Sequence, residues 1–135
     1  MKWNYYIYIL FLVTCTSKQP IVVQERQTPI IPAIGVRADD PKLYLENGRW
    51  FYGDSLFSGH VHAFHSNGNM QRMQTYYQGK EEGLLLTWFQ DGQKESERYF
   101  VAGEKDGLHK GWWENGMRRF EYQFKNGAYE GDFKE

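Results

Sequence analysis

Glycine recurs at intervals of 24 residues through the C-terminal part of the chain, and this spacing restricts the possible folds more than any other feature. Aromatic residues keep the same interval. The columns are Gly59, Gly83, Gly107 and Gly131; Gly68, Gly92 and Gly116; Gly79, Gly103 and Gly127; Tyr52, Tyr76, Phe100 and Phe124; and Phe64, Trp88 and Trp112. Because chance does not hold five columns in register, the chain contains an internal repeat.

Each repeat is predicted to form a β-hairpin. The glycines of the second column follow Asn67, Asp91 and Asn115, and such pairs favour type I′ turns, in which both central residues have positive φ. In the first complete repeat, the two strands are expected at about residues 60–65 and 70–77. The glycines of the first and third columns are interpreted as further turn positions.

The predicted fold class is all-β: a single-layer antiparallel β-meander of repeated hairpins. The repeat domain is expected over residues 43–135, with repeats near 59–82, 83–106 and 107–130 and a partial repeat before residue 59, turned by Asn47-Gly48. No segment with a helical period is available to cover either face. Because aromatic residues make up 18% of the chain and aliphatic residues are scarce, ring contacts across strands are expected to supply most of the cohesion.

Alternation along the strands predicts which side chains share a face. The Trp88 and Trp112 side chains fall on one face of the sheet. The Phe89 and Trp113 side chains fall on the other face, where small residues such as Gly111 are expected to leave a groove.

The N-terminal segment predicts export. Residues 5–13 form an unbroken apolar run behind Lys2, too short for a bilayer-spanning helix of about 20 residues but typical of a signal peptide, here expected at 1–14. Cys15 follows directly and is the single cysteine, which excludes an internal disulfide. Residues 15–42 contain all four prolines and no aromatic residue, and they predict a disordered tether.

The string Leu12-Val13-Thr14-Cys15 resembles a bacterial lipobox, although Thr14 stands where Gly, Ala or Ser is preferred. The resemblance implies cleavage before Cys15, a diacylglycerol on its thiol and a stable membrane anchor. Because Thr16 rather than Asp follows the cysteine, resemblance to Gram-negative sorting rules favours the outer membrane. The alternatives are an ordinary signal peptide, an uncleaved anchor, or an apolar strand with a chance cysteine.

A second resemblance covers residues 47–133. From residue 83 to residue 107 the sequence GLLLTWFQDGQKESERYFVAGEKDG is similar to the MORN-repeat variant, and proteins built of such repeats are grouped with the YwqK-type antitoxin family. The resemblance implies a sheet of β-hairpins. Some members of the family neutralise a partner toxin, so an antitoxin- or immunity-like role is one form that the function could take.

The function predicted from these features is a non-catalytic, membrane-anchored protein of the bacterial cell envelope whose repeat surface binds another protein. The candidate interaction residues are Trp88, Phe89, Trp112, Trp113, Tyr76, Phe100 and Phe124. Large aromatic side chains are enriched at protein interfaces. The alternative is a glycan- or peptidoglycan-binding module that uses the same Trp and Phe pairs. The net charge of -1 gives no electrostatic reason to expect a nucleic-acid partner.

Enzymatic and metal-binding functions are less favoured. The residues His60, His62 and His65 form the pattern H-x-H-x-x-H, but alternation places the third on the opposite face, and zinc needs three or four convergent ligands. Glu97 and Glu121 are candidates for acid–base catalysis, yet their equivalent places in adjacent repeats explain them as surface residues. We therefore expect no catalytic residue, no cofactor and no metal site.

Overall fold

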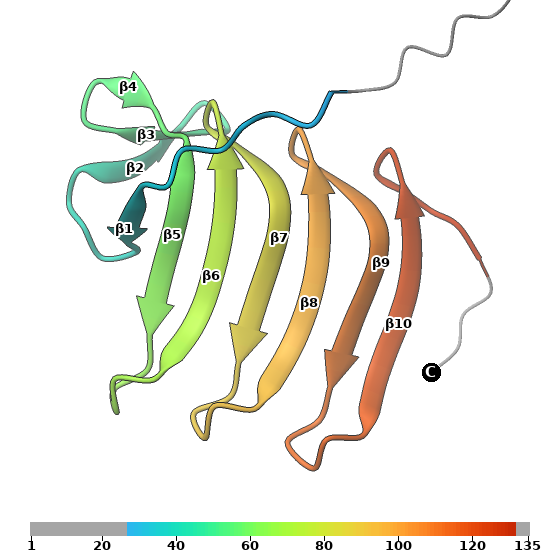
Figure 1. Cartoon of the computed structure of the whole chain (residues 1–135). Helices are drawn as coiled ribbons and strands as arrows, with labels where there is room; N and C mark the ends of the chain where they lie inside the picture. Colours follow the sequence, from blue (N-terminus) through green and yellow to red (C-terminus); the bar gives the residue numbers. More distant parts are fainter. Residues whose placement is uncertain (1–26, 132–135) are drawn as a thin grey trace, which may run out of the picture.

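The computed structural model describes residues 27–131, which form eleven β-strands and no helix (Figure 1). The predicted all-β class is confirmed for this part of the chain. The predicted signal peptide at 1–14, Cys15 and the first part of the predicted tether lie outside the described residues, as do residues 132–135.

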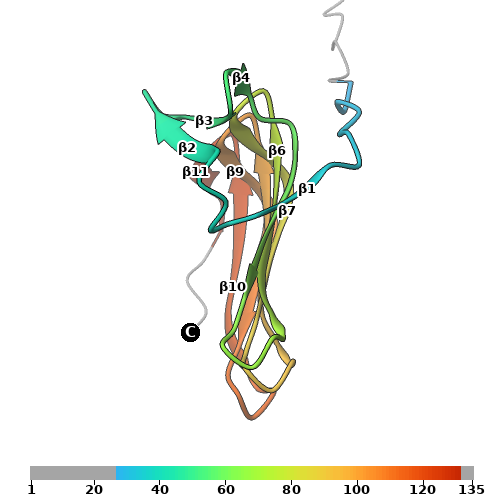
Figure 2. The same ribbon diagram turned by 90° about the vertical axis from the view of Figure 1, so that its left-hand side faces the viewer.

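An eight-stranded sheet forms the body of the molecule, in the order β1-β5-β6-β7-β8-β9-β10-β11. Its strands are β1 (Gly35–Arg37), β5 (Gly59–Phe64), β6 (Met70–Tyr77), β7 (Lys80–Trp88), β8 (Lys94–Val101), β9 (Glu104–Trp112), β10 (Arg118–Lys125) and β11 (Ala128–Tyr129). From β5 onward each strand pairs antiparallel with the next, whereas β1 pairs with β5 in parallel. Seen edge-on, the sheet is one layer over most of its height (Figure 2).

Strand β1 lies inside the segment 15–42 that the sequence predicts to be a tether, so that prediction is wrong for the end of the segment. Val36 in this strand is buried in the core, and the Ile34 carbonyl accepts a hydrogen bond of 2.7 Å from the His60 N–H. Without β1, strand β5 would be the edge of the sheet, and its outward backbone N–H and C=O groups would be unpaired. The short apolar stretch around Val36 pairs with these groups and covers them.

A separate three-stranded sheet is formed by β2 (Leu43–Glu46), β3 (Arg49–Tyr52) and β4 (Ser55–Leu56). The partial repeat expected before residue 59 therefore does not extend the large sheet but folds against one face at its end, where the single-layer prediction is wrong (Figure 2). Phe57 fixes the junction, because its N–H donates to the Trp50 carbonyl at 2.9 Å and its carbonyl accepts from the Gly79 N–H at 2.7 Å.

The hydrophobic core lies where the two sheets meet. Its buried residues are Val36, Leu43, Phe57, Val61 and Tyr76, with Trp50 and Tyr52 packed against them. The ring centroid of Tyr76 lies 5.7 Å from that of Trp50 and 6.1 Å from that of Phe57. Burial raises the pKa of Tyr76 to about 12, because an enclosed phenolate loses its hydration. Rings therefore provide much of the core at this end of the molecule.

Two kinds of turn occupy opposite ends of the large sheet. Near the small sheet, both residues have positive φ in the pairs Gln78-Gly79, Ala102-Gly103 and Asn126-Gly127, as type I′ turns require. At the other end, only the glycine of each predicted pair has a positive φ, which is 88° at Gly68, 89° at Gly92 and 80° at Gly116. The type I′ prediction is therefore wrong for Asn67-Gly68, Asp91-Gly92 and Asn115-Gly116, whereas Asn47-Gly48 has φ of 48° and 73°, as a type I′ turn requires.

Side-chain capping explains the difference. The Asn67 Oδ1 atom accepts a hydrogen bond of 3.0 Å from the Asn69 N–H, and the same bond recurs in the next two repeats. Bonds of this kind stabilise an Asx turn. The Gly68 N–H donates to the His65 carbonyl at 2.9 Å, so the left-handed glycine closes a short loop with a bulge.

A polar side chain also caps each type I′ turn. The acceptors are Ser58 Oγ for the Gln78 N–H at 2.8 Å, Glu82 Oε2 for the Ala102 N–H at 2.9 Å and Asp106 Oδ2 for the Asn126 N–H at 3.4 Å. Because these three acceptors are spaced 24 residues apart, they form a further column of the repeat. The members of this column share only a polar side-chain oxygen, so the sequence alone does not reveal it.

Three glycines of the first column, Gly59, Gly83 and Gly107, lie in strands, so their prediction as turn residues is wrong. Gly83 in β7 and Gly107 in β9 have φ of 77° and 68° and lie beside register shifts against the preceding strand. Positive φ at such a shift indicates a β-bulge. Gly59 begins β5, where a Cβ atom would lie 2.5 Å from the Ile34 carbonyl oxygen. Close approach of two backbones therefore explains this glycine.

Replacing Ala102 with asparagine is expected to raise the free energy of unfolding by about 1 kcal/mol. Ala102 has a φ of 53°, and this left-handed conformation costs most L-residues about 1–2 kcal/mol, whereas asparagine tolerates it. Asn126 occupies the equivalent turn position in the next repeat. Chemical denaturation of the A102N variant and of the wild type measures the difference. A variant that is no more stable than the wild type would contradict the prediction.

Candidate functional site

The strand registers place the predicted interaction residues on two faces. One face, which we call the aromatic face, carries Tyr76, Phe100, His109, Phe120 and Phe124. Trp88 and Trp112 point to the opposite face, because adjacent residues alternate along a strand. Phe89 and Trp113 follow the ends of β7 and β9, and Trp113 shares a hollow with residues of the aromatic face. The predicted interaction residues therefore do not form one continuous surface.

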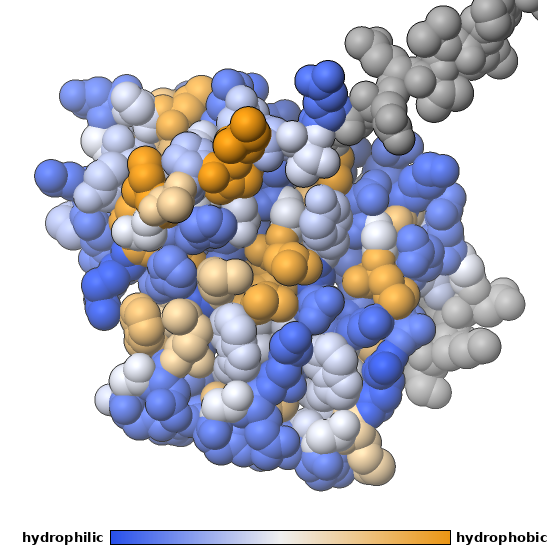
Figure 3. All heavy atoms as spheres, viewed as in Figure 1, coloured by the Kyte–Doolittle hydropathy of each residue, from blue (hydrophilic) through white to orange (hydrophobic). Residues whose placement is uncertain are grey.

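Many rings of the aromatic face pack on one another. The ring centroid of His109 lies 5.6 Å from that of Phe100 and 4.7 Å from that of Phe124, which in turn lies 5.8 Å from that of Tyr129. Such contacts account for Phe100 and Phe124 as packing residues. On the face displayed in Figure 3, apolar side chains lie in separate groups among polar ones.

The groove expected over Gly111 is filled. Phe120 is the direct cross-strand partner of Gly111, and a Cβ atom on that glycine would lie 2.2 Å from the Phe120 ring. The ring therefore lies flat against the glycine backbone and covers it. Next to it, the hydroxyls of Thr87 and Ser96 are joined by a hydrogen bond of 2.7 Å. The open space lies instead at the end of the hairpins.

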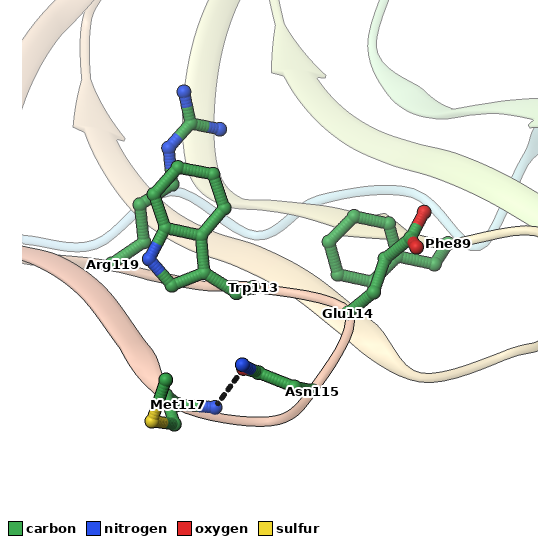
Figure 4. Close-up of a pocket in the computed structure, with 6 residues that line it drawn as sticks. All are labelled: Phe89, Trp113, Glu114, Asn115, Met117 and Arg119. Atoms are coloured by element: carbon green, nitrogen blue, oxygen red, sulfur yellow. Dashed lines mark hydrogen bonds between the residues drawn. The ribbon is translucent and has the colours of Figure 1, made fainter.

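A hollow of about 640 Å³ opens at the tips of the second and third hairpins (Figure 4). We call it the tip hollow; it is lined by Phe89, Trp113, Glu114, Asn115, Met117 and Arg119. Trp113 is 49% exposed and Met117 is 62% exposed. Figure 4 shows Trp113 and Arg119 together on one side of the hollow, Phe89 and Glu114 on the other, and Asn115 and Met117 below them.

Local sequence explains why the space opens between these two tips. The Asn67 and Asn69 side-chain amides both donate to the Gln90 carbonyl at 2.9 Å, which closes the first tip against the second. One repeat later the equivalent residues are Asp91 and Gln93, and the amide of Gln93 donates to the Asp91 carboxylate at 2.8 Å. The side chains of the second tip therefore bond to each other instead of to the third tip, and the space between these two tips stays open.

A second hollow of about 530 Å³ adjoins the tip hollow on the aromatic face. We call it the arginine hollow; it is lined by Arg98, Trp113, Arg118, Arg119, Phe120 and Tyr122. Trp113 and Arg119 line both hollows. The Arg119 Cζ atom lies 4.5 Å from the Trp113 ring centroid, and the Arg98 Cζ atom lies 5.6 Å from that of Phe120. Both distances are typical of cation–π contacts.

Sequence reasoning missed Arg98, Arg119 and Met117 as site residues. The register of β10 against β9 shifts between Arg118 and Phe120, so Arg119 is an extra residue at the hairpin end. No glycine marks this irregularity, and alternation from the strand centre therefore does not locate it. The only signal in the sequence is a pair of arginines next to the turn that follows the Trp-Trp pair.

His109 is buried against the rings of Phe100 and Phe124, with 2% of its surface exposed. Its Nε2 atom donates to the Tyr99 carbonyl at 2.8 Å. Burial lowers the pKa of His109 below its ordinary value, and the charges of Arg98 and Lys105 act in the same direction, against the hydrogen bond to Tyr99. The folded protein therefore favours a neutral imidazole at this position.

The depressed pKa of His109 predicts a loss of stability in mild acid. Below the ordinary pKa of 6.5 the unfolded chain binds a proton that the folded chain resists, so the free energy of unfolding falls as pH decreases. The slope reaches at most about 1.4 kcal/mol per pH unit for one proton. A His109→Leu variant, which carries the residue type of Leu85 one repeat earlier, is expected to lose this slope. Denaturation curves between about pH 5.5 and pH 7.5 measure it, and an equal slope in both proteins would refute the assignment.

The other titratable candidates have structural partners. His60 and His62 lie on one face with ring centroids 6.4 Å apart, and His65 Nε2 donates to the Trp88 carbonyl at 2.8 Å. Glu97 is ion-paired with Lys94 at 2.9 Å, and Glu121 is ion-paired with Arg118. Among residues 27–131, no three His, Cys, Asp or Glu side chains gather where they could hold one metal ion.

No family model, curated protein or solved structure matches the chain. The resemblances to a lipobox and to MORN repeats therefore stay predictions. Within residues 27–131, the structure has no helix long and apolar enough to cross a membrane. What the fold and the site define is an all-β repeat protein with an open aromatic hollow that adjoins a group of arginines.

Proposed function

We propose that the protein is a non-catalytic, lipid-anchored protein of the bacterial cell envelope that binds another protein at the tip hollow. The observation that carries the proposal is Trp113, which is 49% exposed at a hollow although most rings of the aromatic face pack on one another. Exposed aromatic side chains at a concave surface commonly supply most of the binding energy of an interface.

The composition of the tip hollow supports a protein partner. Aromatic residues, methionine and arginine are enriched at the centres of protein interfaces, and Trp113, Met117 and Arg119 represent each of these types. Methionine adapts its shape to an apolar side chain. Glu114 and Asn115 line the same hollow, and their polar groups can form hydrogen bonds with the hydroxyls of a sugar. A glycan is therefore the alternative ligand.

Photo-crosslinking in intact cells of the native host tests the proposal. A photoreactive residue in place of Glu114, which lines the hollow, is introduced into the full-length chain. A specific polypeptide adduct is expected with the otherwise wild-type chain and is expected to be lost with Trp113→Ala. The matched control is Trp112→Ala, because Trp112 is the neighbouring tryptophan on the opposite face and lies under Arg118.

The outcomes separate the two ligand classes. Retention of the adduct in the Trp113→Ala chain, or equal loss in a folded Trp112→Ala chain, would refute the proposal. Circular dichroism establishes that each variant is folded. If soluble peptidoglycan fragments change the tryptophan fluorescence of the wild type but not of Trp113→Ala, and no polypeptide adduct forms, the glycan alternative replaces the protein partner.

The proposed anchor is tested separately at Cys15. Mass spectrometry of the mature protein is expected to show cleavage before Cys15 and a diacylglycerol on its thiol, and fractionation is expected to place the protein in the outer membrane. An uncut chain with an unmodified Cys15 would contradict the proposal. This result does not depend on the partner.

The repeat unit itself is proposed to be MORN-like. The support is that the same turn contacts recur every 24 residues, at the Asx turns and at the capped type I′ turns. An antitoxin- or immunity-like role is one form of the proposed binding. In that form the crosslinked polypeptide is a toxin, and its activity is inhibited by the purified full-length chain.

A further inference from the structure

Within residues 27–131, two arginines that line the arginine hollow lie over rings and have no carboxylate partner. In residues 27–131 the side-chain ion pairs join Arg37 with Asp39, Lys94 with Glu97 and Arg118 with Glu121. Neither Arg98 nor Arg119 takes part in one. Both line the arginine hollow, and their guanidinium groups lie over Phe120 and Trp113 respectively.

This arrangement leaves the hydrogen-bond donors of the two groups available. A guanidinium group stacks on a ring through its flat face, whereas its N–H donors point outward in the plane of the group. Those donors match the two oxygens of a carboxylate, and a bidentate pair of this kind is among the stronger hydrogen-bonded contacts in proteins. Stacking also limits the rotation of a long side chain, so less entropy is lost when an anion binds.

We propose that the arginine hollow and the tip hollow together bind an acidic segment of the partner protein. Its carboxylates lie at Arg98 and Arg119, and a neighbouring apolar side chain packs against Phe89 and Trp113. The inference rests on the proposed function and specifies the chemistry of the partner. The two hollows share Trp113 and Arg119 as lining residues, so they adjoin and one extended segment can reach both.

Charge complementarity sets the orientation of the segment. On the aromatic face, the cross-strand neighbours of Arg98 and Phe120 are Leu85 and Gly111, and neither carries a charge. Glu114 is the acidic residue of the tip hollow and lines its rim. A bound carboxylate is therefore attracted to the arginine side and repelled from the Glu114 side. The apolar or basic end of the segment lies towards Glu114.

The apolar lining favours a peptide over a sugar acid, which carries the same carboxylate. Phe89, Trp113 and Met117 present ring carbons and a thioether to the tip hollow. An aliphatic or aromatic side chain gains free energy when it is buried against such groups, whereas the hydroxyls of a sugar lose hydration there. We therefore assign the site to a protein segment.

Binding of short peptides to the full-length chain tests the inference. The probe is a blocked peptide in which aspartates flank one phenylalanine, and the matched peptide carries asparagines instead. Isothermal titration is expected to show tighter binding of the acidic peptide, with an affinity that falls as salt is added. Arg98→Gln and Arg119→Gln are each expected to weaken the binding about tenfold or more, because each removes a charge-assisted contact.

Arg37→Gln is the matched control. Arg37 also stacks on a ring, with its Cζ atom 5.1 Å from the Phe64 centroid, but Asp39 accepts two hydrogen bonds from its guanidinium at 2.9 and 3.0 Å. This substitution removes the same charge from the chain and is expected to leave peptide affinity unchanged. Loss of affinity in Arg37→Gln equal to that in the other two variants would refute the site and indicate a general charge effect.

Other outcomes distinguish failure of this inference from failure of the proposed function. Equal affinity for the acidic and neutral peptides, or no binding of the acidic peptide, refutes the inference. If the Trp113-dependent adduct still forms in intact cells, the proposed function stands. Stronger, arginine-dependent binding of an alginate oligosaccharide refutes a protein segment and indicates an anionic glycan. Loss of the adduct in both Arg98→Gln and Arg119→Gln chains, but not in Arg37→Gln, supports the inference in the cell.

Discussion

Replacing Tyr76 with alanine is expected to lower the free energy of unfolding by about 3–5 kcal/mol, the usual cost of removing a large buried ring. Tyr76 is 3% exposed and contacts the rings of Trp50 and Phe57, so its side chain joins the large sheet to the small one. The substitution would leave a cavity between the two sheets. Urea denaturation, followed by tryptophan fluorescence and by circular dichroism, measures the loss.

The conservative variant separates ring packing from the hydroxyl. Tyr76→Phe keeps the ring in the core and is expected to change the free energy of unfolding by less than about 1 kcal/mol. A large loss in both variants would show that the hydroxyl, rather than the packing of the ring, provides the stability. A small loss in Tyr76→Ala would contradict the placement of the core at this end of the molecule.

Replacing Gly79 with alanine is expected to destabilise the protein by about 2–4 kcal/mol. Gly79 has a φ of 78°, and a Cβ atom there would lie 2.7 Å from the Trp50 carbonyl oxygen and 3.0 Å from the Leu56 side chain. The Trp50 oxygen belongs to the backbone of the small sheet, so it can move away only if the junction opens. Chemical denaturation measures the change.

Gly92→Ala is the matched control for the effect of φ alone. Gly92 has a φ of 89°, but no atom lies within 4 Å of the Cβ position. Its substitution is expected to cost only about 1–2 kcal/mol, the penalty for a left-handed L-residue. The difference between the two variants measures the close approach of the sheets at Gly79. Equal losses would contradict that role.

The 24-residue interval was sufficient to predict the strands of the three complete hairpins and their faces, because side chains alternate along any strand whatever its neighbours are. Val61 and His109 accordingly share the aromatic face, as equivalent positions in the repeat predict. The type of each turn was harder to predict from the sequence. The difference between Asn67-Gly68 and Gln78-Gly79 depends on whether the capping side chain belongs to the turn itself, as in Asn67, or comes from an earlier part of the chain, as in Ser58 just before β5.

Tertiary contacts account for the features that were not predicted. The small sheet has the same alternation as the large one, and the ring contacts of Phe57 and Trp50 with Tyr76 hold it against one face. The groove over Gly111 was predicted from residue size alone, whereas the cross-strand partner Phe120 fills that space. The arginine hollow depends on the bulge at Arg119 in β10, and no glycine in the sequence marks that position.

The small sheet covers only one end of the large one, and this asymmetry has a dynamic consequence (Figure 2). Strands β5 and β6 share the buried core, whereas β10 is paired on its outer side by β11, which has only two residues. Amide hydrogen exchange is therefore expected to be slowest in β5 and β6 and to become faster towards β10, as the sheet frays from its thin edge. Because Arg119 lies in β10 and Trp113 lies at the same hairpin tip, a ligand bound there would slow the exchange of β10 most.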